Sequence, residues 1–138
     1  MSTEATVSGA SSGFAQKISA GGHTVAADEA PELGGTGTGP SPHELLLSAL
    51  GACTSMTVSM YARRKGWPLQ HVDVKLTLFK VDDKGEPSVS GTTTRIDRQV
   101  RLTGPLSDEQ RERLLEIANK CPVHKTLTHP IDIHTSVS

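Results

Sequence analysis

Apolar residues recur at helical spacing between Ser41 and about Lys65, a pattern that predicts one long helix. Ser41 is a good N-cap, Pro42 suits the first turn, and Glu44 completes a capping box with Ser41. Cys53 belongs to the apolar stripe of this helix, whose members are Leu46, Ala49, Leu50, Cys53, Met56, Thr57 and Met60. Small residues around the stripe would let another backbone approach closely.

Extended segments lie on both sides of this helix. Residues 14–20 and 23–29 flank Gly21-Gly22 and predict a hairpin, and residues 33–40 are rich in glycine and predict a loop. Residues 71–81 and 92–104 alternate between apolar and polar positions, which is typical of strands with one buried face. Residues 1–13 are small and polar and are expected to be disordered, which leaves residues 14–138 as a single domain.

The C-terminal third predicts two more helices and a strand. Residues 105–120 form a second helical pattern, in which Ser107 and Gln110 make another capping box. A break follows, then a short helix with Pro122 in its first turn, and residues 131–137 read as a last strand. Because strands and helices occur in mixed order, we predict an α+β fold.

Composition narrows the class of protein. The chain has 138 residues, which fits one domain; 35% are hydrophobic but only 3% aromatic, so its core is aliphatic and lean. So small a store of large apolar residues suggests that part of the apolar surface is buried between two chains. The net charge of −1 gives no indication of nucleic-acid binding, and no run of eighteen apolar residues predicts a membrane span. The N-terminal segment does not resemble a secretory signal, and two cysteines are too few for a disulfide framework, so we expect a cytoplasmic protein with reduced thiols.

The two cysteines are the main candidates for chemistry. Cys121, in KCPVHKTL, falls at the cap position of the short helix, where unpaired backbone N–H groups favour a thiolate and His124 and Lys125 could add positive charge. Cys53 lies in the middle of a helix and has no such help. On these residues alone, a buried, inert side chain is the favoured interpretation of each cysteine.

Other catalytic and binding motifs are weak. Cys121, His124, His129 and His134 are close in sequence and Cys53 could join them, but this spacing matches no established zinc site, so no metal is expected. The segment GGTGTGP lacks the lysine of a phosphate-binding loop, and no G-x-S-x-G nucleophile elbow occurs. No cofactor is predicted.

Two segments resemble the OsmC/Ohr family of thiol-dependent organic hydroperoxide reductases. The first is PELGGTGTGPSPHELLLSALGACTSMTVSMYARRKGWPL and the second is IANKCPVHKTL, and the resemblance extends from about Phe14 to Ile133. It implies an α+β fold in which long central helices pack against antiparallel strands. It also implies an intertwined homodimer with two active sites at the subunit interface.

The resemblance further implies a mechanism. Cys53 would be the thiolate that attacks an organic hydroperoxide and becomes a sulfenic acid, and Cys121 would form a disulfide with it. A dithiol reductant would restore both thiols. Met56 and Met60 flank Cys53 and would make an apolar mouth that favours alkyl peroxides over hydrogen peroxide. The alternatives are a binding module of the same fold without turnover, and a metal protein.

The sequence departs from the family pattern at two charged positions. In the well-studied branches a glutamate directly follows the helix-starting proline; here that position is His43, and the glutamate follows at Glu44, about 100° further around the helix. Those branches also use an arginine from the N-terminal region beside the thiolate, but no arginine precedes Arg63. Lys17, His23 or His43 could supply the positive charge, with Glu44 as a further candidate partner.

Overall fold

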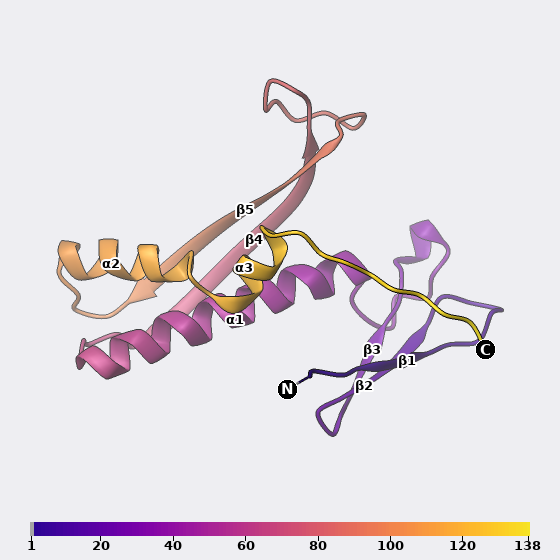
Figure 1. The fold of residues 1–138 in the computed structure, drawn as a ribbon, viewed down its shortest axis with the longest axis horizontal. Coiled ribbons are helices and arrows are strands. Elements are labelled where there is room, and N and C mark those ends of the chain that lie inside the picture. Colours follow the sequence, from indigo (N-terminus) through magenta and orange to yellow (C-terminus); the bar gives the residue numbers. More distant parts are fainter. Residues whose placement is uncertain (1) are drawn as a thin grey trace. The chain divides into compact units, whose positions relative to one another are not determined.

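The computed structural model describes residues 2–138 and shows a mixed α/β architecture with antiparallel strands (Figure 1). The described chain divides into two compact units, one up to Leu46 and one from Leu47 onward, and α1 contributes to both. In chain order the elements are β1 (Thr6–Ser8), β2 (Gln16–Ala20), β3 (His23–Ala27), a short 3-10 helix η1 (Pro31–Leu33), α1 (Pro42–Lys65), β4 (His71–Val81), β5 (Thr93–Thr103), α2 (Asp108–Ala118) and α3 (Pro122–Leu127).

The first unit contains an antiparallel sheet in the order β1-β2-β3. The predicted hairpin is confirmed: Gly21 and Gly22, both at positive φ, join β2 to β3, a conformation that glycine adopts without steric cost. β1 lies within the segment 1–13 for which disorder was expected, and it pairs with β2; Met1 lies outside the described residues.

A buried carboxylate organises the glycine-rich loop that follows β3. Asp28 is 2% exposed and accepts hydrogen bonds from the hydroxyls of Thr36, at 2.6 Å, and Thr38, at 2.8 Å. The backbone N–H groups of both threonines and of Glu29 donate to it as well. The two threonine hydroxyls hold the pKa of Asp28 far below its usual range, so this carboxylate stays ionised and fixes the loop at neutral pH.

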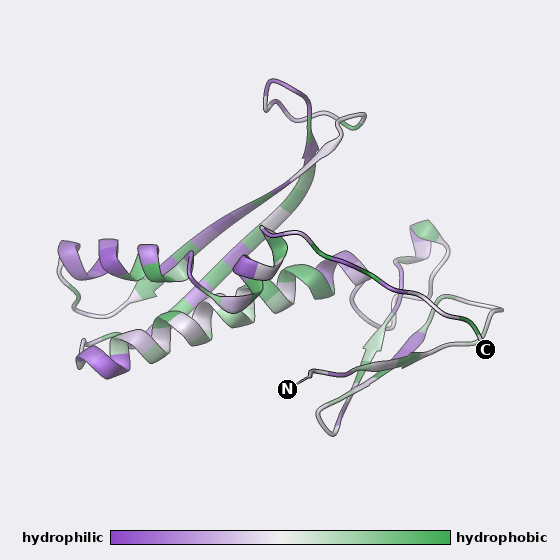
Figure 2. Ribbon diagram, in the orientation of Figure 1, coloured by the Kyte–Doolittle hydropathy of each residue, from purple (hydrophilic) through white to green (hydrophobic). Residues whose placement is uncertain are grey.

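α1 begins as its capping box predicts. The backbone N–H of Ser41 donates to Glu44 Oε1 at 2.9 Å, and the N–H of Glu44 donates to Ser41 Oγ at 3.2 Å. The helix ends at Lys65, before Gly66, which adopts positive φ. Figure 2 shows polar residues gathered at the two ends of α1 and more apolar residues through its middle.

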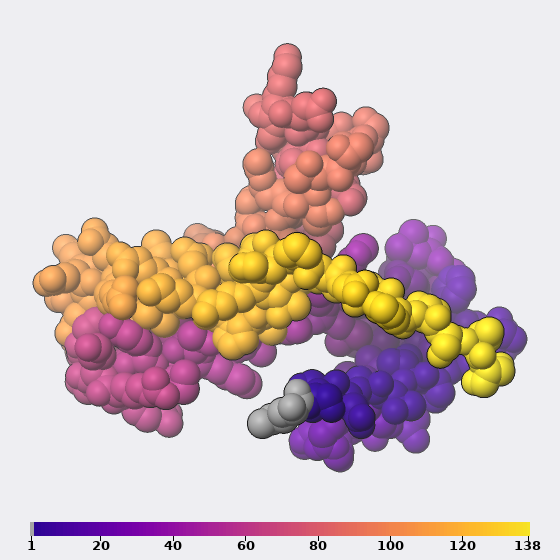
Figure 3. All heavy atoms as spheres, in the orientation of Figure 1, coloured from indigo at the N-terminus to yellow at the C-terminus, as the bar shows by residue number. Residues whose placement is uncertain are grey.

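The second unit packs α1 and α2 against a two-stranded antiparallel ribbon of β4 and β5. Its innermost residues are Val58 and Ala62 of α1 with Leu114 and Ala118 of α2, all at most 1% exposed. Partly buried residues of both strands complete this core, namely Val72, Val100 and Leu102. In Figure 3, α2 and α3 lie along α1, while the loop end of the ribbon projects away from the helices.

Gly51 sets the spacing between α1 and the ribbon. It is buried on the helix face that meets β4, and a Cβ atom added there would lie 2.9 Å from Leu76 Cδ1. Real Cβ contacts are essentially never this short, so any other residue would force a shift in Leu76 or its strand. Glycine therefore allows the close approach of helix and strand at this point.

Two expectations for the C-terminal third need correction. The second helix was predicted over residues 105–120 but spans Asp108–Ala118, because Ser107 is its N-cap; the capping box with Gln110 is confirmed. The strand predicted at residues 131–137 is wrong for the described chain: the segment forms neither helix nor strand, and its apolar side chains, Ile131, Ile133 and Val137, are exposed. No strand in residues 2–138 pairs with it, so its alternation has no sheet to join.

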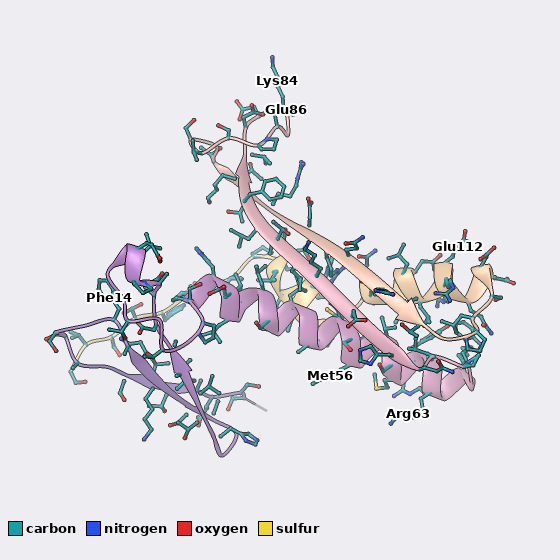
Figure 4. All side chains as sticks on the ribbon, turned by 180° about the vertical axis from the view of Figure 1, so that it is seen from behind. Phe14, Met56, Arg63, Lys84, Glu86 and Glu112 are labelled. Carbon is teal, nitrogen blue, oxygen red and sulfur yellow. The ribbon has the colours of Figure 1, made fainter. Side chains whose placement is uncertain are left out.

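The side of α1 away from the core carries exposed apolar side chains. Met56 is 71% exposed and Met60 49%, and Figure 4 shows Met56 on the side of α1 that faces away from α2. By length and composition α1 could also cross a membrane, a weak indication because core helices of soluble proteins pass the same test. One face of α1 thus lies in the core of the second unit, and the apolar face that carries Met56 and Met60 is exposed to solvent.

Candidate active site

The fold brings the two cysteines together. Cys53 lies in the middle of α1 and is partly exposed, whereas Cys121 is the N-cap of α3 and is fully buried. They are 68 residues apart in sequence (121 − 53 = 68), so only the packing of α3 on α1 can place them side by side. Thr54, the residue after Cys53, has its hydroxyl 3.8 Å from Cys121 Sγ.

Successive backbone N–H groups in the first turn of α3 point at the two sulfurs. Val123 N–H lies 3.5 Å from Cys53 Sγ, and His124 N–H lies 3.3 Å from Cys121 Sγ. Pro122 occupies the first helical position, where a missing N–H costs nothing. Both sulfurs therefore accept from neighbouring N–H groups of one helical turn, which places them close to each other.

Arg98 is the cation of the site, and the sequence reasoning did not identify it. It lies on β5, where its guanidinium donates to Thr54 Oγ1 at 3.1 Å, Asn119 Oδ1 at 2.7 Å and His124 Nδ1 at 3.1 Å. Strand alternation places it on the same partly buried face as Ile96 and Val100. A charge on an apolar strand face is the signal that could have revealed it.

The surroundings of Cys121 favour its thiolate. Burial alone would raise the pKa of Cys121, but the backbone N–H of His124, hydrogen bonds from Cys53 and Thr54, and the charge of Arg98 together lower it below the usual cysteine value. The groups that favour the Cys121 thiolate thus come from α1, β5 and the first turn of α3.

His124 is neutral at physiological pH. Burial and the positive charge of Arg98 both lower the pKa of His124. Its Nδ1 atom accepts from Arg98, because an arginine can only donate, so the ring proton resides on Nε2. His124 therefore adds a fixed acceptor for Arg98, not a second positive charge beside the sulfurs.

The charge partners predicted from sequence lie on other parts of the chain. Lys17 is exposed on β2, His23 is exposed at the start of β3, and both belong to the first unit. His43 is exposed in the first turn of α1, and Glu44 forms the capping box there. Hydrogen bonds from the backbone and hydroxyl of Ser41 lower the pKa of Glu44, as expected for a carboxylate that caps the helix.

A cavity of about 430 Å³ lies next to the guanidinium. Its apolar lining comes from leucine, isoleucine and valine side chains, and its polar lining is Thr94, Arg98, Asn119, His124 and Thr128. Met56 and Met60 are not part of this lining; they lie on the open face of α1. The described residues contain no group of three or more histidine, cysteine or acidic side chains that could hold a metal ion.

A family comparison and a comparison with solved structures both find OsmC-like proteins. The family described as OsmC-like protein matches residues 35–136. A search of curated proteins gives no significant match. Among solved structures, an OsmC-like protein from Mycoplasma pneumoniae is similar with a TM-score of 0.74 and 20% identity, covering 92% of this chain and 87% of that one.

Two other similar structures carry functional names. An organic hydroperoxide resistance protein OsmC from Legionella pneumophila has a TM-score of 0.65 and 20% identity, covering 93% of this chain and 90% of that one. The organic hydroperoxide resistance protein OhrB of Bacillus subtilis has a TM-score of 0.61 and 19% identity, covering 96% and 94%. At these identities the likeness concerns the fold, and the expected α+β fold is confirmed. Together with the family match over most of the sequence, it shows that this chain belongs to the OsmC-like protein family.

Proposed function

We propose that this protein is a thiol-dependent peroxidase that reduces organic hydroperoxides to alcohols. The observation that carries the proposal is the pairing of Cys53 and Cys121 within one hydrogen-bonded cluster, although they come from different helices. The names of the relatives from Legionella pneumophila and Bacillus subtilis support hydroperoxides as the substrate class. A binding module without turnover would not need two thiols in contact.

The proposed reaction has two oxidative steps. The Cys53 thiolate attacks the distal oxygen of the hydroperoxide, the O–O bond breaks, and the alkoxide takes a proton and leaves as the alcohol. Cys53 is then a sulfenic acid. The Cys121 thiolate attacks that sulfur, and hydroxide leaves and is protonated to water. The product is a Cys53–Cys121 disulfide, which a dithiol reduces in a later step.

Exposure supports Cys53 as the residue that meets the peroxide. Cys53 is partly exposed at the edge of the open apolar face of α1, near Met56 and Met60, whereas Cys121 is fully buried. An apolar surface beside the attacking sulfur favours alkyl hydroperoxides over hydrogen peroxide. Arg98 is the cation that we expect to hold negative charge in the thiol pair, the role for which Lys17, His23 and His43 were candidates from sequence.

The first test is a single turnover. Fully reduced protein treated with one equivalent of cumene hydroperoxide is expected to lose two hydrogens within seconds, which intact-mass spectrometry and a free-thiol count would both record. A matched reaction with hydrogen peroxide is expected to be slower. If the wild-type protein keeps both thiols after minutes with cumene hydroperoxide, the peroxidase proposal fails and a binding role is favoured.

We also propose that the protein is a homodimer. Met56 and Met60 leave an apolar strip open on α1, and the apolar residues of the C-terminal segment, Ile131, Ile133 and Val137, are exposed as well. A second copy is the partner that the family resemblance implies, and it would cover apolar surface that monomeric proteins rarely expose. Sedimentation equilibrium is expected to give twice the chain mass at micromolar concentration. A monomer mass at that concentration would contradict this proposal.

A further inference from the structure

The two sulfurs differ sharply in access to solvent. Cys121 is fully buried beneath Thr54 and the first turn of α3, while Cys53 is partly exposed on α1. A thiol that approaches from solvent therefore reaches Cys53 first. In a disulfide made from this pair, the sulfur of Cys53 would be the one open to attack, because displacement needs the nucleophile in line with the bond that breaks.

The polar groups of the site are arranged around the other sulfur. His124 N–H donates to Cys121 Sγ at 3.3 Å, and the Thr54 hydroxyl lies 3.8 Å from it. Thr54 Oγ1 accepts from Arg98, so its own proton is available to Leu50 O, at 2.7 Å, or to the sulfur. Negative charge on Cys121 would thus meet a backbone donor, a hydroxyl and a guanidinium.

No carboxylate in the described part of the chain forms an ion pair with Arg98. None of the ion pairs found among residues 2–138 includes Arg98, and its acceptors Thr54, Asn119 and His124 are uncharged. Two of these acceptors also fix the orientation of the guanidinium, since Nη2 contacts both Asn119 and His124. A partly buried cation without a counter-ion is positioned to stabilise an anion that forms beside it.

From these observations we propose that the site fixes the direction of the reductive step: the reductant attacks Cys53, and Cys121 leaves as a thiolate stabilised by the network that Arg98 holds in place. The inference rests on the proposed function only in requiring that the two cysteines form a disulfide. Arg98 acts here as a positioning residue through Thr54 and His124.

The step balances with a dithiol as the reductant. One thiolate of the dithiol forms a bond to Cys53 Sγ, the Cys53–Cys121 bond breaks, and its electron pair remains on Cys121. The second thiolate of the dithiol then attacks the reductant sulfur of the mixed disulfide, which closes a cyclic disulfide and releases the Cys53 thiolate. The reductant loses two electrons and the protein gains two. A leaving thiolate of lower pKa departs faster, so stabilising Cys121 accelerates the first exchange.

The test starts from a disulfide made with diamide, so that a protein without peroxidase activity can still be examined. The oxidised protein is mixed with 2-mercaptoethanol, quenched within seconds with N-ethylmaleimide in denaturant so that the buried thiol is also labelled, and digested for mass spectrometry. The expected product carries mercaptoethanol on Cys53 and maleimide on Cys121. Mercaptoethanol on Cys121 would overturn the inference, and so would failure of diamide to form the disulfide.

A pair of arginine variants tests the role of the network. Arg98→Met is expected to slow reduction of the diamide-formed disulfide by dithiothreitol by about three- to tenfold. Arg101→Met is the matched control, because Arg101 is exposed three residues further along β5; it is expected to react at the wild-type rate. A wild-type rate in Arg98→Met would overturn the role of Arg98.

The pH dependence of thiol ionisation separates this role from a structural one. The titratable or charged groups around Cys121 are Cys53 from α1, Arg98 from β5 and His124 from α3. In reduced Cys53→Ser protein, where Cys121 is the remaining thiol, the pH midpoint for ionisation of Cys121, followed by the ultraviolet absorbance of the thiolate, is expected to rise when Arg98→Met is added, because removal of the positive charge disfavours the thiolate. Arg98→Lys is expected to restore part of the shift, and an unchanged midpoint in a folded Arg98→Met would count against the inference.

Discussion

Cys53→Ser is expected to reduce the rate of reaction with cumene hydroperoxide by about a thousandfold, because a serine hydroxyl is not ionised at neutral pH and is a far weaker nucleophile. Cys53 is the partly exposed member of the pair, so its loss leaves only a sulfur that the peroxide cannot reach. Stopped-flow consumption of the hydroperoxide would measure the rate. Circular dichroism would show that the variant is folded.

Cys121→Ser is the matched control for this prediction. It keeps the attacking sulfur and removes its partner, so the first step is expected to proceed at a rate within about tenfold of the wild type. The sulfenic acid at Cys53 then has no partner thiol and is expected to accumulate, where dimedone would label it. If Cys121→Ser loses the reaction and Cys53→Ser keeps it, the two roles are reversed.

Leu114→Ala is expected to lower the free energy of unfolding by about 3 kcal/mol, which corresponds to a decrease in Tm of about 10 °C. Leu114 is fully buried where α2 meets Val58 and Ala62 of α1, so the lost side chain leaves a cavity in the core that joins the two helices. Thermal and urea unfolding followed by circular dichroism would measure the change.

Leu115→Ala is the control for this substitution. Leu115 is the next residue of α2, but it is 57% exposed, so removal of the same atoms is expected to cost less than about 1 kcal/mol. If the two variants are equally stable, the core is not where the structure places it.

Because Cys121 follows α2 closely in sequence, Leu114→Ala is also expected to slow thiol chemistry at elevated temperature before the protein unfolds fully.

Local sequence signals were sufficient wherever a structure depends on neighbouring residues. The N-terminus of α1 follows from the Ser41–Glu44 capping box, and the β2–β3 hairpin follows from Gly21-Gly22. The segment at residues 131–137 shows the limit of such signals, since a strand needs a second strand to pair with, and no sequence pattern guarantees one.

Local sequence was also insufficient to identify the charged residue of the site. Arg98 lies among Arg95, Asp97 and Arg101, so in the sequence it resembles part of a solvated strand. Only the position of α1 and α3 against β5 turns this one guanidinium toward Thr54 and His124. The cysteines could be proposed from motifs, but the cation beside them could not be selected, because that choice depends on which strand face the helices cover.

The absence of a side chain at Gly51 connects helix packing with thiol acidity. Leu76, the residue that a Cβ at position 51 would contact, is the direct cross-strand partner of Arg98. A bulkier residue at Gly51 would press on the strand that carries the partner of Arg98, and so change how far the guanidinium reaches toward Thr54. A substitution at this glycine, which touches neither sulfur, is therefore expected to change the reactivity of the two cysteines through the packing of α1 on the ribbon.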